Sequence, residues 1–119
     1  MAAKVSKYDN RLIGTWISDR RRTFQNYKPK RGFDPKKLRK LKSLFGKFII
    51  RWGRRKYYTQ LGNYRDTSSY EVVDRDTHSV VIRCWCDIFK EYTLRQIQFE
   101  DDCYFIALGG GLCEYFRRA

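Results

Sequence analysis

Residues 47–61 read KFIIRWGRRKYYTQL, and their pattern is the clearest indication of the fold class. Two short runs, 47–52 and 55–61, carry the alternation of apolar and polar side chains that is typical of strands with one covered face. Between them stands Gly53-Arg54, which fits a two-residue turn with glycine at the position that needs positive φ. The stretch therefore predicts an antiparallel β-hairpin.

The rest of the chain repeats this pattern of short apolar runs and tight turns. The other expected strands are residues 12–18, 69–74, 79–86, 92–99, 103–108 and 112–118. Eight short strands joined mostly by tight turns form a meander, and a meander of this size closes most economically into a barrel without free edges. A two-sheet sandwich is the alternative, although it usually needs longer crossing connections. The expected fold is all-β: an eight-stranded antiparallel up-and-down barrel, forming a single domain over residues 1–119.

One amphipathic helix is expected between the first two strands, over residues 34–46. Asp34 suits the N-cap, Pro35 suits the first helical position and Gly46 suits the C-terminal stop. Leu38, Leu41 and Phe45 share one face at three- and four-residue spacing. The remaining faces carry five basic side chains: Lys36, Lys37, Arg39, Lys40 and Lys42.

The positive charge of the chain is confined to one segment. The net charge is +13, and residues 20–56 contain 16 of the 26 lysines and arginines but only one of the 13 acidic residues. A localised imbalance of this kind indicates an anionic partner, such as a nucleic acid, an anionic membrane or an acidic protein, although a solvated basic face is the simpler reading. The candidate polyanion-binding residues are Lys36, Lys37, Arg39, Lys40, Lys42, Arg54 and Arg55.

Several other classes of function find little support in the sequence. The N-terminus has no apolar signal segment and no window resembles a membrane span, so we expect a cytoplasmic protein with reduced cysteines. Cys84 and Cys86 are one residue apart, whereas zinc ribbons use Cys-x2-Cys pairs, and the single histidine, His78, falls in a turn. We expect no metal and no cofactor. Catalytic motifs are also missing, so we expect no enzyme.

The interior of the expected barrel is the main candidate site. Phe48, Ile50 and Trp52 alternate on one strand face, and Ile82 lies on a second such face with Val80. An eight-stranded barrel is just wide enough either to hold one small ligand or to be filled by its own side chains, and both remain open.

Arg95 has two possible orientations in the strand 92–99. If it shares the inward face with Ile97 and Phe99, it becomes a buried cation that a ligand headgroup could neutralise. If Leu94 faces inward instead, Arg95 lies in solvent. A slip of one residue separates the two, and the sequence leaves both open.

Gly14-Thr15-Trp16, within the first strand, resembles the motif that opens the barrel of the calycin superfamily, which contains the lipocalins and fatty-acid-binding proteins. The resemblance implies that Trp16 closes one barrel end beneath an arginine of the last strand. Alternation with Cys113 and Tyr115 favours Arg117 for this role. A guanidinium stacked on an indole contributes roughly 1–2 kcal/mol when partly desolvated.

The resemblance also implies a function, a non-enzymatic carrier for a small apolar or acidic ligand. Arg95 and Tyr115 are then the expected headgroup contacts, and Phe48, Ile50, Trp52 and Ile82 line the cavity. The basic helix serves as a lid that docks on anionic surfaces such as a membrane. The alternative is a nucleic-acid-binding module that uses the basic strip of residues 20–56.

Overall fold

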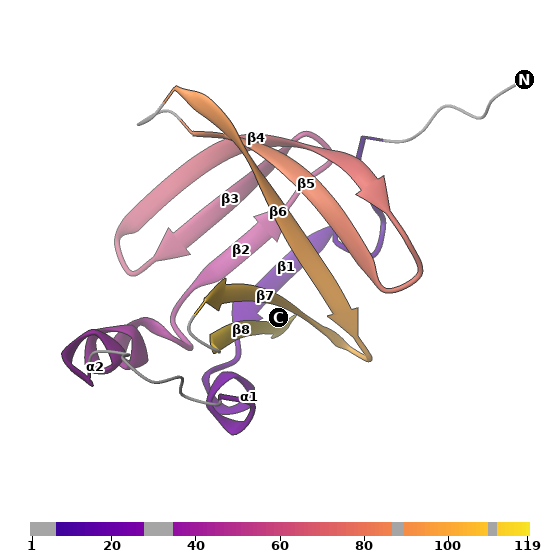
Figure 1. Ribbon diagram of the computed structural model, residues 1–119. Helices are drawn as coiled ribbons and strands as arrows, with labels where there is room; N and C mark the ends of the chain where they lie inside the picture. Colours follow the sequence, from indigo (N-terminus) through magenta and orange to yellow (C-terminus); the bar gives the residue numbers. More distant parts are fainter. Residues whose placement is uncertain (1–6, 28–34, 87–89, 110–111) are drawn as a thin grey trace, which may run out of the picture.

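The computed structural model describes residues 7–27, 35–86, 90–109 and 112–119. Eight antiparallel strands follow one another around a closed barrel, with the last strand paired to the first (Figure 1). The strands are β1 (Gly14–Ser18), β2 (Ile49–Trp52), β3 (Lys56–Leu61), β4 (Tyr64–Arg75), β5 (Ser79–Cys86), β6 (Glu91–Glu100), β7 (Cys103–Gly109) and β8 (Leu112–Arg118). The predicted fold class is confirmed, and the sandwich alternative is wrong.

The strand bounds differ from the expected ones chiefly in β4, which begins at Tyr64 rather than at residue 69. Gly62, with φ of 59°, allows the tight turn from Leu61 to Tyr64, and Leu61 pairs with Tyr64. Residues 64–69 are mostly exposed, so no hydrophobic alternation marked them as a strand. The turn residues Gly62-Asn63 were the available signal.

The turn between β2 and β3 differs in detail from its prediction. The Gly53 amide donates to the Lys56 carbonyl at 2.8 Å and Trp52 pairs with Tyr57, so Gly53 lies opposite Lys56 and the turn residues are Arg54 and Arg55. Among the described glycines, positive φ occurs at Gly14, Gly46 and Gly62. The hairpin is confirmed, but its two turn residues are Arg54 and Arg55 rather than Gly53 and Arg54, and the expected positive φ at Gly53 is wrong.

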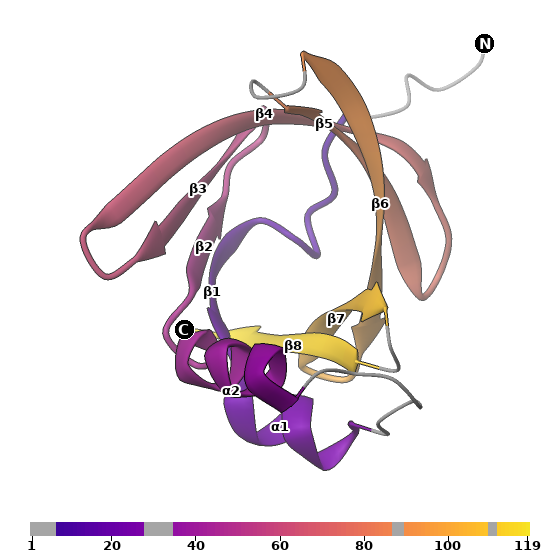
Figure 2. The same ribbon diagram turned by 60° about the vertical axis from the view of Figure 1, so that its left-hand side comes forward.

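Two helices, rather than the one expected, connect β1 to β2 at one end of the barrel (Figures 1 and 2). The unexpected helix, α1 (Arg20–Gln25), begins after Asp19, whose side chain accepts a hydrogen bond from the Arg22 amide at 3.0 Å. Buried Thr23 holds α1 against β8, because its hydroxyl accepts a hydrogen bond from the Tyr115 amide at 3.0 Å.

The expected helix is α2 (Pro35–Leu44), while its expected N-cap, Asp34, lies outside the described residues. Just after α2, buried Phe45 packs on Phe24 of α1 with ring centroids 5.5 Å apart. The Gly46 amide donates to the Ser18 hydroxyl at 3.1 Å. These contacts attach the end of α2 to the barrel rim at the end of β1.

The N-terminal residues close the opposite end of the barrel. Leu12 is fully buried, and the Lys7 carbonyl accepts a hydrogen bond from the Val72 amide at 2.8 Å. Asp9 is buried and pairs with Arg11 at 2.9 Å, and the hydrogen bonds from Arg11 lower the pKa of this carboxyl. Arg11 also donates to the Thr77 carbonyl at 2.8 Å, which ties the segment to the β4–β5 turn.

Aromatic rings fill the barrel at this closed end. Tyr104 is fully buried, stacks on Phe116 at 4.9 Å and meets Trp16 edge-on at 4.7 Å. Its hydroxyl accepts a hydrogen bond from the Trp52 indole at 3.1 Å. Because every polar atom of these rings needs a partner when buried, the Trp52–Tyr104 bond also fixes the rings in one arrangement.

Trp16 lies beneath an arginine of the last strand, but that residue is Arg118 and the prediction of Arg117 is wrong. The guanidinium of Arg118 lies 4.3 Å from the indole centroid and donates to the carbonyls of Ile13 (2.8 Å) and Arg11 (2.9 Å). Alternation places Phe116 and Arg118 on the inward face of β8 and Arg117 on the outward face. The prediction from the sequence therefore placed the inward face of β8 one residue away from where the structure has it.

The structure shows why the motif Gly14-Thr15-Trp16 begins with glycine. Its φ is 124°, and a Cβ at this position would lie 2.7 Å from Nη1 of Arg118. A larger residue would therefore strain the backbone and push the arginine off Trp16.

Replacing Arg118 should destabilise the fold, whereas replacing Arg117 should not. Arg118→Ala removes a cation–π contact and two hydrogen bonds, so we expect the free energy of unfolding to fall by about 1–2 kcal/mol. Arg117→Ala, at an exposed outward position, should change it by less than about 0.5 kcal/mol. Urea unfolding of both variants gives the comparison. Equal losses in the two would contradict the assignment.

Candidate ligand-binding cavity

A cavity of about 200 Å³ remains inside the barrel, toward the helical end. Its apolar wall consists of Phe48, Ile50, Trp52, Ile82, Ile106 and Phe116. Its polar groups are Tyr57, Thr59, Cys84, Arg95 and Glu114. Both readings of the interior thus apply in part, because aromatic rings fill one end and leave a small space at the other. Of the six residues expected to bind ligand, the structure brings five together here: Phe48, Ile50, Trp52, Ile82 and Arg95.

Arg95 faces inward, while Leu94 is 67% exposed. Fully buried Ile97 lies two residues further along β6 and shares the inward face, and Arg95 pairs across the sheet with Ile82. The alternative with Leu94 inside is wrong.

The guanidinium stands where the cavity meets solvent. β6 pairs with β7 only from Gln98 to Glu100, so the sheet is open beside Arg95. Arg95 also lines a shallow outer hollow of about 340 Å³ between these strands. Within the described part of the chain, no carboxylate forms an ion pair with Arg95. It is therefore a cation at the mouth of an apolar cavity with its charge unneutralised.

Glu114 is the acidic group of the cavity. It is half-buried, and its Oε2 accepts a hydrogen bond from the Ser18 hydroxyl at 2.9 Å. Burial raises the pKa of this carboxyl because the charged form loses hydration, and the Ser18 bond opposes the shift only in part. When it is protonated, this carboxyl can donate a hydrogen bond into the cavity.

Cys84 and Tyr57 complete the polar lining. Burial raises the pKa of the Cys84 thiol, and the hydrogen bond with Tyr57 and the charge of Arg95 only partly oppose it. Burial likewise raises the pKa of the Tyr57 hydroxyl. Both groups stay protonated at neutral pH, so they act as weak hydrogen-bonding groups rather than as nucleophiles.

The size of the cavity limits what it can hold. Sites for drug-sized ligands occupy about 300–1,000 Å³, whereas a cavity of about 150 Å³ is enough for benzene. A space of about 200 Å³ therefore fits a compact ligand about the size of one substituted ring, and the chain of a long fatty acid does not fit.

Tyr115 does not belong to this site, and its prediction as a headgroup contact is wrong. It lies on the outer face of β8, where its ring stacks on Phe105 at 4.9 Å and its carbonyl accepts a hydrogen bond from the Asp19 amide at 2.7 Å. Its neighbours Glu114 and Phe116 face inward. The same one-residue error moved Tyr115 inside and Arg117 onto Trp16.

The candidate polyanion-binding residues lie on two elements at opposite ends of the barrel, α2 and the β2–β3 turn (Figure 1). Lys36, Arg39 and Lys40 are exposed on α2, while the side chains of Lys37 and Lys42 lie outside the described residues. Arg54 and Arg55 are exposed in the β2–β3 turn, beyond the far end of β2. The candidate residues whose side chains the structure describes are thus divided between α2 and the β2–β3 turn.

Sequence reasoning missed Glu114 as a cavity residue. A signal was present, because Glu114 is the one carboxylate within the apolar strand 112–118 and lies two residues before Phe116. Ile106, Tyr57 and Thr59 carried no comparable signal, since alternation gives two equivalent faces until one of them is anchored.

No protein-family model matches the chain, and the searches of curated proteins and of solved structures found no similar protein. The fold and cavity therefore define its class: a closed eight-stranded antiparallel barrel with a small internal cavity. No helix among the described residues is long and apolar enough to span a membrane.

The raised pKa of Glu114 predicts a pH-dependent stability. A raised folded-state pKa stabilises the fold below the unfolded pKa of 4.5, and this contribution is lost as the pH rises through the folded-state value. Glu114→Gln, which stays neutral, should therefore gain in stability relative to the wild type as the pH increases from about 4 to about 8. Urea unfolding across this range measures the difference, with Glu91→Gln at an exposed position as the control. Parallel curves for the wild type and Glu114→Gln would contradict the burial of this carboxyl.

Proposed function

We propose that the protein is a non-enzymatic, calycin-like binding protein that takes one small acidic ligand into its barrel. The main observation in support is the position of Arg95 at the mouth of an apolar cavity of about 200 Å³. Among the described residues, no carboxylate forms an ion pair with this cation. An apolar ligand body fits against the aromatic and aliphatic wall, and its anionic group meets the guanidinium.

The energetics favour a charged headgroup. A hydrogen bond to a charged group contributes about 1.5–3 kcal/mol, and a guanidinium can bind a carboxylate through two parallel bonds. One aromatic ring adds burial at about 25 cal/mol per Å². After the cost of immobilising the ligand, such a compact molecule reaches dissociation constants of roughly micromolar to millimolar.

Glu114 supports an acidic ligand as long as it is neutral. The protonated carboxyl can donate a hydrogen bond to the ligand, whereas the ionised carboxylate would repel an anion. Because burial favours the neutral form, the cavity is more receptive to an anion than a solvent-exposed Arg–Glu site would be.

The binding of benzoate, compared with that of its neutral analogue benzamide, tests this function. We expect the wild type to prefer benzoate by at least about tenfold, and Arg95→Met to remove this preference while leaving benzamide binding intact. Isothermal titration calorimetry measures both ligands. Arg65→Met, at an exposed position on β4, is the matched control. Equal benzoate binding by the wild type and Arg95→Met, or no benzoate binding by the wild type, would refute the proposal.

The second part of the proposal concerns α2, as a docking surface for anionic membranes. Its basic side chains Lys36, Arg39 and Lys40 are exposed, and the Phe24–Phe45 contact holds the end of the helix at the barrel rim. Each basic residue near an anionic membrane surface contributes about 1 kcal/mol.

Vesicle sedimentation tests the docking surface. Replacing Lys36, Arg39 and Lys40 by Gln should weaken binding to vesicles of phosphatidylcholine with phosphatidylglycerol by at least about tenfold. The matched control replaces Arg54, Arg55 and Lys56 by Gln, which removes the same charge from the other end of the barrel. An equal effect of both triple variants would argue against docking through α2.

A further inference from the structure

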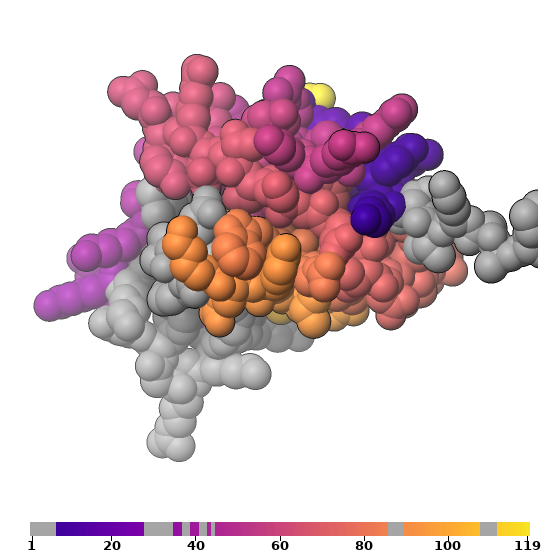
Figure 3. Space-filling model, turned by 90° about the horizontal axis from the view of Figure 1, so that it is seen from above, coloured from indigo at the N-terminus to yellow at the C-terminus, as the bar shows by residue number. Residues whose placement is uncertain are grey.

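A second and larger hollow lies on the outer face of the barrel, at the end opposite the helices. Its volume is about 980 Å³, and β4 and β5 form its floor. The end-on view shows how residues near the N-terminus, the β2–β3 turn and the first part of β6 gather around these strands (Figure 3). The inward faces of β4 and β5 form part of the core, so this groove is separate from the cavity.

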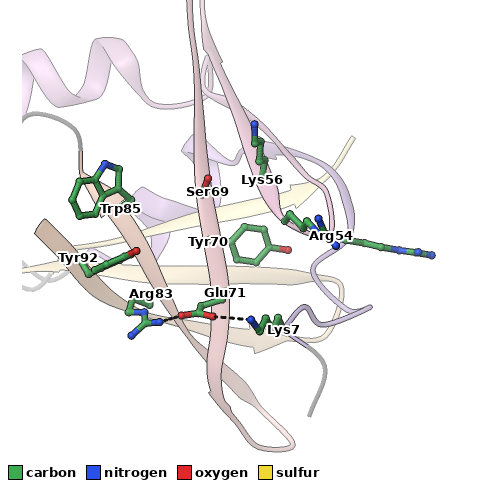
Figure 4. Close-up of a pocket in the computed structure, with 10 residues that line it drawn as sticks. Lys7, Arg54, Lys56, Ser69, Tyr70, Glu71, Arg83, Trp85 and Tyr92 are labelled. Atoms are coloured by element: carbon green, nitrogen blue, oxygen red, sulfur yellow. Dashed lines mark ion pairs between the residues drawn. The ribbon is translucent and has the colours of Figure 1, made fainter. Parts of the chain in front are cut away.

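The groove is strongly positive. Five basic side chains line it: Lys7, Arg54, Arg55, Lys56 and Arg83. Among the described residues that line it, the one carboxylate is Glu71, which forms ion pairs with Arg83 and with Lys7 at 4.0 Å (Figure 4). Among the described residues, no carboxylate forms an ion pair with Arg54, Arg55 or Lys56, at and beside the β2–β3 turn. The local charge excess therefore faces solvent.

An aromatic pair forms the other wall of the groove. Trp85 and Tyr92 are directly opposite one another on β5 and β6, with ring centroids 4.9 Å apart. Tyr92 is 61% exposed, and the Arg83 guanidinium lies 4.8 Å from its ring. In Figure 4 the two aromatic residues lie on one side of β4, while Arg54 and Lys56 lie on the other.

We propose that this groove is a binding site for single-stranded nucleic acid. Phosphates bind the cations of the β2–β3 turn and Lys7, and a base stacks against Tyr92 and Trp85. Aromatic side chains beside a positive track form the usual platform for single strands, because unpaired bases have free faces for stacking. In a duplex the bases stack on one another, and a flat bilayer would meet only the rim of a hollow.

Fluorescence anisotropy with labelled oligothymidylate and oligouridylate tests the proposal at salt concentrations from about 50 to about 200 mM. Replacing Arg54, Arg55 and Lys56 by Gln should weaken binding at least tenfold and reduce the salt slope by about two, since each phosphate contact on a single strand adds about 0.7 to it. The matched control removes the same charge from α2 through Gln at Lys36, Arg39 and Lys40. It should change the affinity less than about twofold.

The contribution of base stacking is tested with a second variant and its matched control. Tyr92→Leu should weaken binding about fivefold or more, because stacking contributes roughly 1–3 kcal/mol per base. Tyr64→Leu, at a position on β4 that is also 61% exposed, should leave binding unchanged. A preference for oligothymidylate or for oligouridylate shows whether the groove binds DNA or RNA. Binding of either oligonucleotide in the groove supports the proposal.

Three results would overturn the proposal. They are equal losses in the two triple variants, an unchanged affinity in Tyr92→Leu, and inorganic polyphosphate or anionic vesicles binding the groove while the oligonucleotides do not. Thermal unfolding confirms that each variant is folded. Benzoate binding is measured in the same variants. Because these substitutions lie outside the cavity, benzoate binding should stay unchanged, so a failure of the groove proposal can be distinguished from a failure of the cavity proposal.

Discussion

The closure of the barrel depends on one contact, the Arg118 guanidinium lying on the Trp16 indole over the space that Gly14 leaves free. This contact joins the last strand to the first, where Trp16 pairs with Arg118 and the Ala119 amide donates to the Thr15 carbonyl at 3.0 Å. It also fixes which side chains face inward. Once Arg118 is on the inward face of β8, alternation places Phe116 and Glu114 on the same face, and the polar lining of the cavity follows from that register.

The two ends of the barrel have different roles for a physical reason. At the end closed by Leu12, large rings pack on one another, and the Trp52 indole donates a hydrogen bond to the Tyr104 hydroxyl. At the helical end, the short pairing of β6 with β7 leaves the sheet open, and Arg95 and Glu114 need solvent or a polar partner. The cavity therefore lies where the barrel's own packing is incomplete.

Much of the fold could be predicted from the sequence, because alternation and turns are local signals. Strands 79–86 and 112–118 have the expected bounds, and Trp16 has the expected role. What failed needed long-range information. The sequence analysis placed the inward face of β8 one residue away from its true position, and this misplaced Tyr115 and Arg117. The helix α1 was missed because it has a capping residue but too few residues to show helical periodicity. The groove at Trp85 and Tyr92 joins segments far apart in the chain.

The proposed function requires Arg95 to receive the anionic group of a ligand held inside the barrel. The most direct measurement follows the guanidinium Nε–Hε resonance of Arg95 and the methyl resonances of Ile50, Ile82 and Ile106 by NMR during a benzoate titration. If the ligand enters the cavity, the resonances of these four residues shift together with a single dissociation constant. Shifts confined to exposed arginines such as Arg54 and Arg55, with the Ile methyl resonances unmoved, would contradict it.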